Sequence, residues 1–299
     1  NEKTAIFLEY RPLLFSIAYN MLGSIDAAED MVQESYMNWT KVKMEEIRQI
    51  KAYLVKIITN NCINQLNRSK IQREQYIGVW LPEPVLNYRS DEMRSGIDSY
   101  HAVSIGILVL LEKLTPQERA IFLLREIFSY DYFELAEIFE KSEDNCRQIF
   151  KRAKDNLGND KKRFTVDIEV HEKILQTFIK ACSEGDMENL IGLLKEDILL
   201  LADGGGNSIA VNGQRLTAAL NPISGVDNVA RFLVRVTVKI YEHIAGLKQK
   251  IVIANGLPSL ISYDGDRPLA LISLDSDGEK IRNIYIQSNP DKLKKFVEE

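Results

Sequence analysis

The spacing of apolar residues changes once along this 299-residue chain, and this change constrains the fold more than any other feature of the sequence. Between residues 6 and 157 the apolar residues recur at intervals of three and four, which indicates amphipathic α-helices. Between residues 250 and 286 they occur in short β-rich runs joined by Asp-Gly turn signals. Helices followed by strands predict two domains, an all-α domain and an α+β domain that starts near residue 165.

The helical half contains two recognisable helix starts and one interruption. Asp26 with Glu29 resembles a capping box. Thr115-Pro116-Gln117-Glu118 combines an N-cap, a proline at the first helical position and a glutamate three residues after the cap. Residues 74–100 lose the helical period and contain two prolines, so they are predicted to form a linker. The predicted helices cover residues 6–21, 26–39, 54–66, 105–114, 115–127, 132–139 and 142–157.

The last two of these helices have the spacing of a helix-turn-helix. Ser142 is predicted to cap the second one, and the turn before it carries Glu140 and Lys141 without the usual glycine. Burial of the apolar stripe leaves polar side chains outside that can contact a DNA major groove, although an ordinary helical hairpin is the alternative. The stripe comprises Cys146, Ile149, Phe150, Ala153 and Leu157, and the outward residues are Asn145, Arg147, Gln148, Lys151 and Arg152.

The helix within residues 51–73 has a polar face of mixed type. One aromatic, one cation and three amides recur at steps of three and four. Such a face can stack an unpaired base and read its edge, and a solvated polar face is the alternative. The polar face comprises Tyr53, Lys56, Asn60, Asn64 and Asn67, and the opposite apolar stripe comprises Leu54, Ile57, Ile58 and Cys62.

The distribution of charge favours nucleic acid as a partner although the net charge is −5. Residues 41–73 carry eight Lys or Arg and two Glu, and residues 147–163 carry seven Lys or Arg and two Asp. Between them, residues 74–140 carry twelve acidic and five basic residues. Two basic blocks with an acidic spacer predict two DNA contacts on one chain, with solvated helix faces as the alternative.

These motifs together resemble regions 2 and 4 of sigma-70-superfamily RNA polymerase sigma factors. Residues 5–39, which include Asp26-Ala27-Ala28-Glu29-Asp30-Met31-Val32-Gln33-Glu34, resemble region 2. Residues 51–73 resemble the part of region 2 that melts the −10 element, and residues 115–157 resemble region 4, which reads the −35 element. The resemblance implies polymerase binding by Asp30, Gln33 and Glu34, −10 binding by Tyr53, Lys56, Asn60, Asn64 and Arg68, and −35 binding by Ser142, Asn145, Arg147, Gln148, Lys151 and Arg152.

The second half narrows the resemblance to extracytoplasmic-function (ECF) sigma factors with a fused SnoaL-like domain of the nuclear-transport-factor-2-like fold. Three segments carry it, and the resemblance implies that they serve regulation. The glycine segment is usually followed by a basic residue, whereas this chain has Asn207. The segments are Trp80-Leu81-Pro82-Glu83-Pro84, Asp203-Gly204-Gly205-Gly206 and Asn289-Pro290-Asp291-Lys292-Leu293.

The resemblance implies a multi-domain chain. Sigma region 2 is expected at residues 1–73, a linker at 74–104, an all-α helix-turn-helix region 4 at 105–163 and a cone-shaped α+β regulatory domain at 165–299. The implied partners are core RNA polymerase, through its β′ clamp and β flap, and promoter DNA, both duplex and melted. A small ligand in the C-terminal domain is a further partner that the resemblance allows. The alternatives are a stand-alone helix-turn-helix regulator with a ligand-binding cone and a SnoaL-type isomerase or cyclase.

Several functional classes are not expected from this sequence. His171, His243, Asp203 and Asp227 cannot be assembled by spacing into a catalytic triad, so no catalytic residue and no cofactor is predicted. Cys62, Cys146 and Cys182 are far apart and indicate neither a disulfide framework nor a zinc site. The absence of a long apolar run and of a signal pattern predicts a cytoplasmic protein without a membrane partner.

Overall fold

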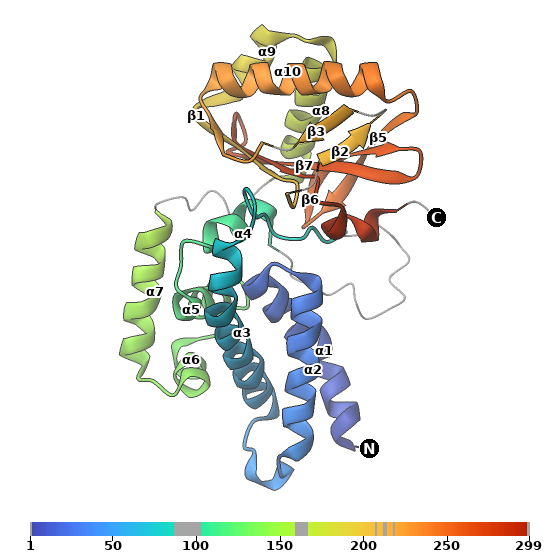
Figure 1. Cartoon of the computed structure of the whole chain (residues 1–299). Helices are drawn as coiled ribbons and strands as arrows, with labels where there is room; N and C mark the ends of the chain where they lie inside the picture. The colour runs from blue at the N-terminus through green and yellow to red at the C-terminus, as the bar shows by residue number, and fades with distance from the viewer. Residues whose placement is uncertain are drawn as a thin grey trace. The chain divides into compact units, whose positions relative to one another are not determined.

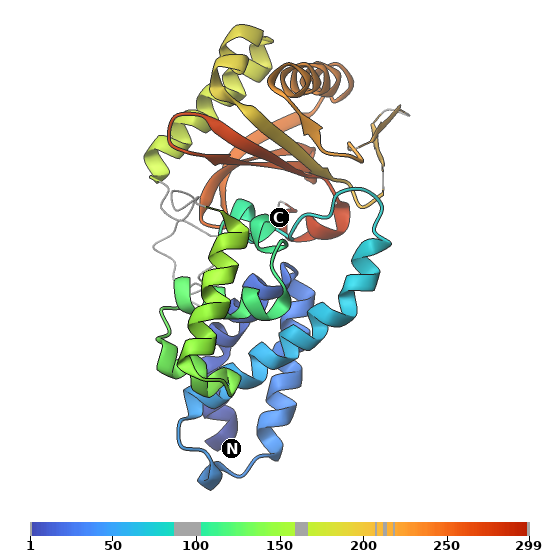
Figure 2. The same cartoon turned by 90° about the vertical axis from the view of Figure 1, so that its left-hand side faces the viewer.

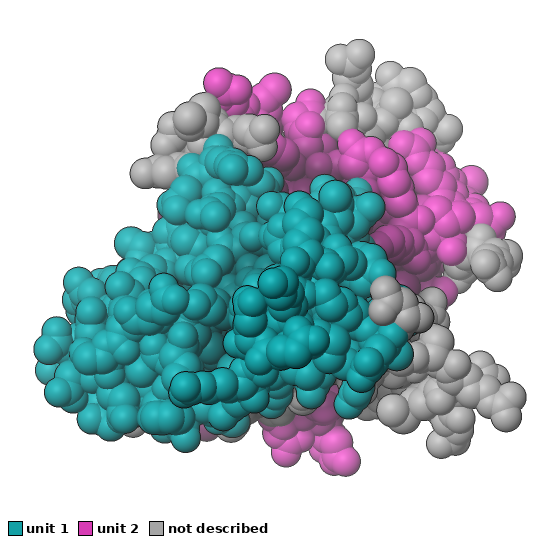
Figure 3. Space-filling model, turned by 90° about the horizontal axis from the view of Figure 1, so that it is seen from below, with its two compact units in different colours: residues 1–74, 90–103, 108–160 teal, residues 75–89, 104–107, 161–299 magenta. Residues whose placement is uncertain are grey.

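The computed structural model describes residues 2–86, 103–158, 167–206, 208–211, 214–217 and 219–297. The chain divides into two compact units (Figure 3). Unit 1 comprises residues 1–74, 90–103 and 108–160, and unit 2 comprises residues 75–89, 104–107 and 161–299. The described part of the predicted linker, residues 75–86, therefore packs with the C-terminal unit. Residues 87–102 of the predicted linker, the boundary at residues 163–165 and Asn207 lie outside the described residues.

Unit 1 is built from helices (Figure 1). Helices α1, α2 and α3 pack against one another, and α5 and α6 contact α3. Their shared core includes the fully buried side chains of Leu14, Trp39 and Ile58. The elements are α1 (Glu2–Leu22), α2 (Ile25–Lys41), η1 (Met44–Glu46), α3 (Ile50–Glu74), α4 (Ile105–Leu111), α5 (Pro116–Glu126), α6 (Tyr132–Phe139) and α7 (Glu143–Leu157); the first three residues of α4 are assigned to unit 2.

The helix starts follow local hydrogen bonding. Thr115 and Glu118 form the predicted capping box of α5, and Ser142 caps α7 as predicted. The predicted start at Asp26 is wrong: Ser24 is the N-cap of α2 and accepts a hydrogen bond from the Ala27 N–H at 3.4 Å. Ser24 is the N-cap because its hydroxyl reaches a free backbone N–H of the first turn. Asp26 cannot cap the helix because it already lies within that turn.

The helix-turn-helix consists of α6 and α7, and its turn needs one residue in an unusual conformation. Glu140 ends α6 with φ 51° and ψ 47°, the left-handed region that normally favours glycine. Its amide donates to the Ala136 carbonyl and so completes the helix end. The turn thus keeps a conventional geometry without glycine, at a conformational cost of about 1–2 kcal/mol.

Arg119 connects α5 to the end of α1 and to α4. Its side chain is buried and only 4% exposed. It lies on α5 and donates to the Met21 carbonyl at the end of α1 at 2.7 Å and to the Leu111 carbonyl of α4 at 3.1 Å. It also forms an ion pair with Glu112 at 2.9 Å. The end of α1 is therefore held against α5 by hydrogen bonds as well as by apolar packing.

Unit 2 contains a mixed six-stranded sheet in the order β4-β1-β8-β7-β6-β5 and a separate β2-β3 pair. Strands β1 and β8 are parallel, and the other neighbouring strands are antiparallel. The elements are α8 (Ile168–Glu184), α9 (Met187–Leu193), β1 (Leu194–Asp203), β2 (Ser208–Val211), β3 (Gln214–Thr217), β4 (Ile223–Ser224), α10 (Val226–His243), β5 (Leu247–Ala254), β6 (Leu257–Asp264), β7 (Arg267–Ser276), β8 (Ile281–Gln287), η3 (Pro290–Lys292) and η4 (Lys294–Phe296).

The two faces of the sheet have different covers. Helices α8, α9 and α10 lie on one face (Figure 2) and form a core with inward residues such as Leu260. Successive strand residues point to opposite faces, so the neighbouring Ile261 belongs to the other face. There it packs in a second core with Leu293 and Phe296 from the C-terminal turns and with Leu86 from the linker. The linker and the C-terminus therefore share one side of the sheet.

Arg119→Ala is expected to lower the free energy of unfolding of the helical unit by about 3 kcal/mol. The substitution removes the donor to two carbonyls and leaves Glu112 without this partner. Arg125→Ala is the matched control, because Arg125 is only half-buried and donates to the single carbonyl of Tyr130 at 2.8 Å. Urea unfolding of the full chain, followed by far-UV circular dichroism, measures both effects. An equal loss in the two variants would contradict the role assigned to Arg119.

Candidate functional site

The outer face of α7 exposes every residue predicted to read the −35 element. Its inner face buries Cys146, Ile149 and Ala153, and the helical period turns the polar positions to the surface. Arg147 has partners of its own: it forms ion pairs with Glu143 at 2.9 Å and with Asp144 at 3.3 Å. The exposed residues are Ser142, Asn145, Arg147, Gln148, Lys151 and Arg152.

Arg147 also lies over the ring of Tyr132 on α6, 4.9 Å from its centre. The three contacts fix the guanidinium against its own helix-turn-helix. A phosphate or a base edge would compete with two carboxylates for the terminal nitrogens of this guanidinium.

The polar face of α3 is exposed along its second half, at Asn60, Asn64, Asn67 and Arg68. The first half of the face has neighbours within unit 1. Tyr53 is half-buried with its ring 6.3 Å from that of Trp39, and Lys56 forms an ion pair with Glu140 at 2.5 Å. This hydrogen bond lowers the pKa of the Glu140 carboxyl. The predicted apolar stripe is shifted: Ile57 is half-buried, while Val55 and Thr59 are fully buried, because neighbouring helices cover two sides of α3.

The predicted polymerase-binding residues lie on the outer side of α2. Asp30, Gln33 and Glu34 are exposed, whereas Met31 and Val32 between them are buried. These three side chains therefore form a polar ridge with an overall negative charge.

The three predicted regulatory segments meet at one carboxylate in unit 2. Asp203 is the last residue of β1 and is fully buried. Its side chain accepts hydrogen bonds from the Tyr76 hydroxyl at 2.5 Å, the Leu81 N–H at 2.9 Å and the Gly205 N–H at 3.0 Å. The fourth partner is the ammonium of Lys292 at 2.7 Å. We call these contacts the linker clamp, formed by Asp203, Lys292, Tyr76 and Leu81.

Lys292 completes the linker clamp from the C-terminal side. Its ammonium donates to the Leu81 carbonyl at 2.6 Å and lies 4.5 Å from the centre of the Trp80 ring. The Trp80-Leu81 peptide segment is therefore held through its N–H by Asp203, through its carbonyl by Lys292 and through its ring by a cation–π contact.

The parallel pairing of β1 and β8 brings the second and third segments together. Asp203 at the end of β1 is the register partner of Gln287 at the end of β8, so the residues that follow both strands emerge side by side. Ser288 donates its N–H and its hydroxyl to the Asp203 carbonyl, at 2.8 and 3.2 Å. The Gln287 amide donates to the Pro82 carbonyl at 3.3 Å, which adds a further contact to the linker.

Asn289 connects the glycine segment to Tyr76. Its amide nitrogen donates to the Tyr76 hydroxyl at 3.0 Å, and its carbonyl oxygen accepts from the Asp291 N–H at 3.0 Å. Burial and the hydrogen bond to Asp203 raise the pKa of the Tyr76 phenol, so it stays protonated as the donor. Gly205 has φ 65°, and a Cβ there would lie 2.5 Å from the Asn289 amide nitrogen. Only glycine fits at this position without displacing Asn289.

Asn255 and Ala254, which the sequence analysis did not identify, bind the linker at residues 85 and 86. Val85 and Asn255 exchange two hydrogen bonds, at 2.8 and 2.9 Å, and Leu86 pairs with Ala254 at the end of β5. Asn255-Gly256 forms the β5–β6 turn with φ of 50° and 76°. An Asn-Gly pair between two alternating runs is a strong hairpin signal and could have located this turn in advance.

The residues considered for catalysis lie apart within unit 2. His171 on α8 is buried, contacts the Pro258 carbonyl at 3.2 Å, and has a pKa lowered by burial. His243 ends α10 and contacts the Lys239 carbonyl of its own helix, and Asp227 is exposed in the first turn of α10. Asp203 belongs to the linker clamp. The structure therefore does not bring these four residues together.

The cysteines are buried, and burial raises the pKa of Cys182 to about 12. In the described ranges, no group of three or more His, Cys, Asp or Glu is arranged to hold a metal ion. None of the described helices is long and apolar enough to cross a membrane.

Gly205→Ala is expected to destabilise unit 2 by about 2 kcal/mol and to loosen the linker clamp, because the new methyl adds a steric clash to the left-handed strain. Gly185→Ala is the matched control: Gly185 has φ 68°, but a Cβ at this position would have no atom within 4 Å, so only the strain applies. Hydrogen exchange of the segment 76–86 reads out the clamp through the Leu81 amide. Equal exchange in the two variants would refute the steric role of Gly205.

Comparison with known families matches two parts of the chain. Residues 6–71 match the model of sigma-70 region 2, and residues 105–157 match that of sigma-70 region 4. The ECF RNA polymerase sigma factor SigJ of Mycobacterium tuberculosis is 26% identical over 296 residues, which cover 96% of this chain and 92% of SigJ. The probable ECF sigma factor SigI of the same species is 24% identical over 221 residues, covering 71% of this chain and 74% of SigI.

The crystal structure of SigJ has the same fold over 97% of this chain and 98% of its own, with a TM-score of 0.74 at 24% identity. The likeness includes the C-terminal helix-and-sheet unit, which agrees with the predicted α+β class of this domain. Both sigma regions occur in their family order, and the full-length relative carries the same additional domain. The chain therefore contains sigma-70 regions 2 and 4, and over nearly its whole length it is similar to the extracytoplasmic-function sigma factor SigJ, whose fold it shares.

Proposed function

We propose that this chain binds core RNA polymerase, recognises promoter DNA and directs transcription initiation, under control of its C-terminal domain. The observation that carries the proposal is the presence of both sigma regions, at residues 6–71 and 105–157, each with an exposed polar helix face. The protein acts in the cytoplasm with the polymerase, and it has no catalytic activity of its own.

The residue roles follow the two regions. In this proposal region 2 comprises residues 1–73 and region 4 residues 105–163, with the linker at 74–104 and the regulatory domain at 165–299. The ridge on α2 binds the β′ clamp, and the α7 face reads the −35 duplex while region 4 contacts the β flap. The α3 face captures unpaired −10 bases, and stacking and hydrogen bonds offset the few kcal/mol that unstacking costs.

Weak DNA binding by the isolated protein follows from the same contacts. Two cations of the proposed DNA-binding faces already have acidic partners, since Lys56 is paired with Glu140 and Arg147 with Glu143 and Asp144. A polymerase that separates α3 from the helix-turn-helix would free Lys56. The protein therefore has a closed state and a polymerase-competent state, and any ligand or contact that distinguishes them shifts the balance.

Control by the C-terminal domain is supported by the linker clamp. Asp203 and Lys292 belong to the C-terminal domain, and both bind backbone atoms of Leu81 in the linker between the two sigma regions. A signal that opens or closes the clamp changes the length of free chain between those regions. A small ligand bound by the C-terminal domain is one form that such a signal can take.

Run-off transcription from a promoter library, with purified core polymerase, tests the function. Start sites that depend on this protein and share two spaced sequence elements are expected. Asp203→Asn removes the charge that Lys292 and Leu81 bind, so this variant should change the transcript yield at the same start sites. DNA binding without any polymerase-dependent transcript would instead favour a stand-alone helix-turn-helix regulator. Unchanged yield with Asp203→Asn would refute control through the linker clamp.

The double substitution Glu143→Gln with Asp144→Asn is expected to strengthen duplex binding about three- to tenfold at low salt. It frees Arg147 for one additional phosphate, so the salt dependence of log K should steepen by up to about one unit. Fluorescence anisotropy of a labelled promoter duplex over a salt series measures both quantities.

Glu137→Gln is the control for this experiment, because it removes an exposed acidic charge from the same helix-turn-helix away from Arg147. A gain in affinity of the same size with Glu137→Gln would mean that net charge alone, and not the release of Arg147, explains the effect.

A further inference from the structure

Two guanidinium groups of unit 1 share the ring of one tyrosine. Arg147 on α7 lies 4.9 Å from the centre of the Tyr132 ring, and Arg125 in the last turn of α5 lies 4.8 Å from it. Arg125 is held in turn, because it donates to the Tyr130 carbonyl at 2.8 Å. The ring therefore connects the end of α5 to an exposed arginine of the helix that is predicted to read the −35 element.

The Tyr132 ring is fixed from the core side. It meets the Phe150 ring edge-on, with centres 6.2 Å apart, and Phe150 stacks at 5.9 Å on Phe122, which is 1% exposed. The backbone of Tyr132 is fixed as well, since the preceding residue caps α6 in a capping box. We call Phe122, Phe150 and Tyr132 the aromatic row. It leads from the buried core to the guanidinium of Arg147.

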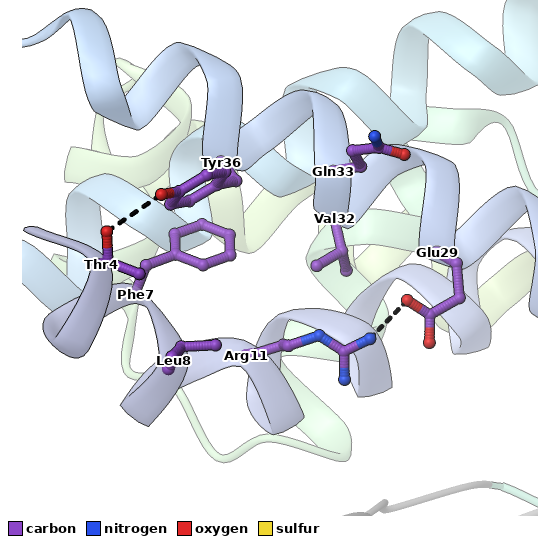
Figure 4. Close-up of a pocket in the computed structure, with 8 residues that line it drawn as sticks. All are labelled: Thr4, Phe7, Leu8, Arg11, Glu29, Val32, Gln33 and Tyr36. Carbon is purple, nitrogen blue, oxygen red and sulfur yellow. Dashed lines mark hydrogen bonds and ion pairs between the residues drawn. The ribbon is translucent and has the colours of Figure 1, made fainter.

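Another edge-on aromatic pair of unit 1, Phe7 with Tyr36, has a different setting (Figure 4). Its ring centres are 5.0 Å apart, and it lines a pocket between α1 and α2 beside the polymerase-binding ridge proposed above. That pair supports the wall of a pocket, whereas the aromatic row ends at an arginine that is predicted to contact DNA.

The ring and the carboxylates hold different parts of Arg147. The carboxylates engage both terminal nitrogens, since Nη2 lies 2.9 Å from Glu143 and Nη1 lies 3.3 Å from Asp144. The ring attracts the charge of the guanidinium and needs none of its N–H donors. The ring contact can therefore persist when a base edge replaces the carboxylates. A guanine edge presents two acceptors, O6 and N7, that match the two terminal nitrogens.

We propose that Tyr132 is a positioning residue, which holds the Arg147 guanidinium while its terminal nitrogens exchange the two carboxylates for O6 and N7 of a guanine in the −35 duplex. The inference rests on the proposed function and deepens it, because it assigns a base to Arg147 and a support to that contact. An arginine that is already held by a ring loses less side-chain freedom on binding than a mobile one. Tyr132 thus strengthens binding to the matching base by acting through Arg147.

Binding of the holoenzyme, the full chain with core polymerase, to promoter duplexes with single base-pair changes in the upstream element tests this role. Arg147→Ala identifies the base pair that Arg147 reads, because discrimination is lost there. Tyr132→Leu is expected to lower affinity about three- to tenfold for the duplex with guanine at that position, as loss of a cation–π contact predicts, and to change it less than about twofold for duplexes without this guanine. Tyr132→Phe keeps the ring and should keep the discrimination. Phe133→Leu is the control, since this neighbouring aromatic is 57% exposed and lies outside the aromatic row.

The double variant Tyr132→Leu with Arg147→Ala separates positioning from a merely structural role. If Tyr132 acts through Arg147, the double variant binds no more weakly than Arg147→Ala alone. Additive losses, or an equal loss for every duplex with Tyr132→Leu, overturn the inference while the proposed function stands. Loss of discrimination at an A·T pair contradicts the assignment of guanine. If the wild-type holoenzyme does not select an upstream element, the proposed function is overturned together with the inference.

Discussion

The buried carboxylate of Asp203 is the interaction on which the organisation of the C-terminal unit depends. Removing a carboxylate from water costs several kcal/mol unless charge and hydrogen bonds replace the solvent. Asp203 has both, through the ammonium of Lys292 and three further donors. These donors come from the linker, from the turn after β1 and from the C-terminal turn, so the charge is stable only when all three segments are in place. One side chain thereby couples parts of the chain that are up to 127 residues apart.

The same requirement explains why the sheet is mixed. A parallel β1–β8 pair places the ends of both strands at one edge, so Asp203 and the residues after Gln287 are neighbours without a long connection. On the sheet face away from the helices, Leu293 and Phe296 then cover apolar residues that would otherwise be exposed. The C-terminal turns therefore have two roles: they supply the counter-ion and complete the second core.

Residue patterns predicted the helical unit well because its determinants are local. The caps at Thr115 and Ser142 and the buried stripe of α7 depend on residues within a few turns of one another. Helix α10 was missed because five valines between Val226 and Val238 favour strands, and its single buried stripe at Val229, Ala230 and Leu233 is short. The parallel β1–β8 pair was missed because it joins segments about 80 residues apart, which local patterns do not encode.

The candidate sites, too, were predictable where they depend on local patterns and were not predictable where they depend on contacts between distant residues. The family resemblance located the three segments that are predicted to be regulatory but not the contacts of the Asp203 side chain that join them, and Tyr76 and Asn255 carry no motif of their own. Burial could be read from helical spacing, so the exposed positions on α7 and on the second half of α3 were predictable. The pairing of Lys56 with Glu140 and of Arg147 with its own helix start depends on side-chain geometry and became visible only in three dimensions.

Helix α3 ends at Glu74, and Tyr76 is already a member of the linker clamp, so a single residue connects the end of this helix to a fixed point of unit 2. While the clamp holds, the tether at this end of α3 has almost no length. If the clamp opens, residues 75–86 become free chain that can extend to about 40 Å. The length of free chain that follows α3 is thus set by one buried ion pair and the hydrogen bonds around it.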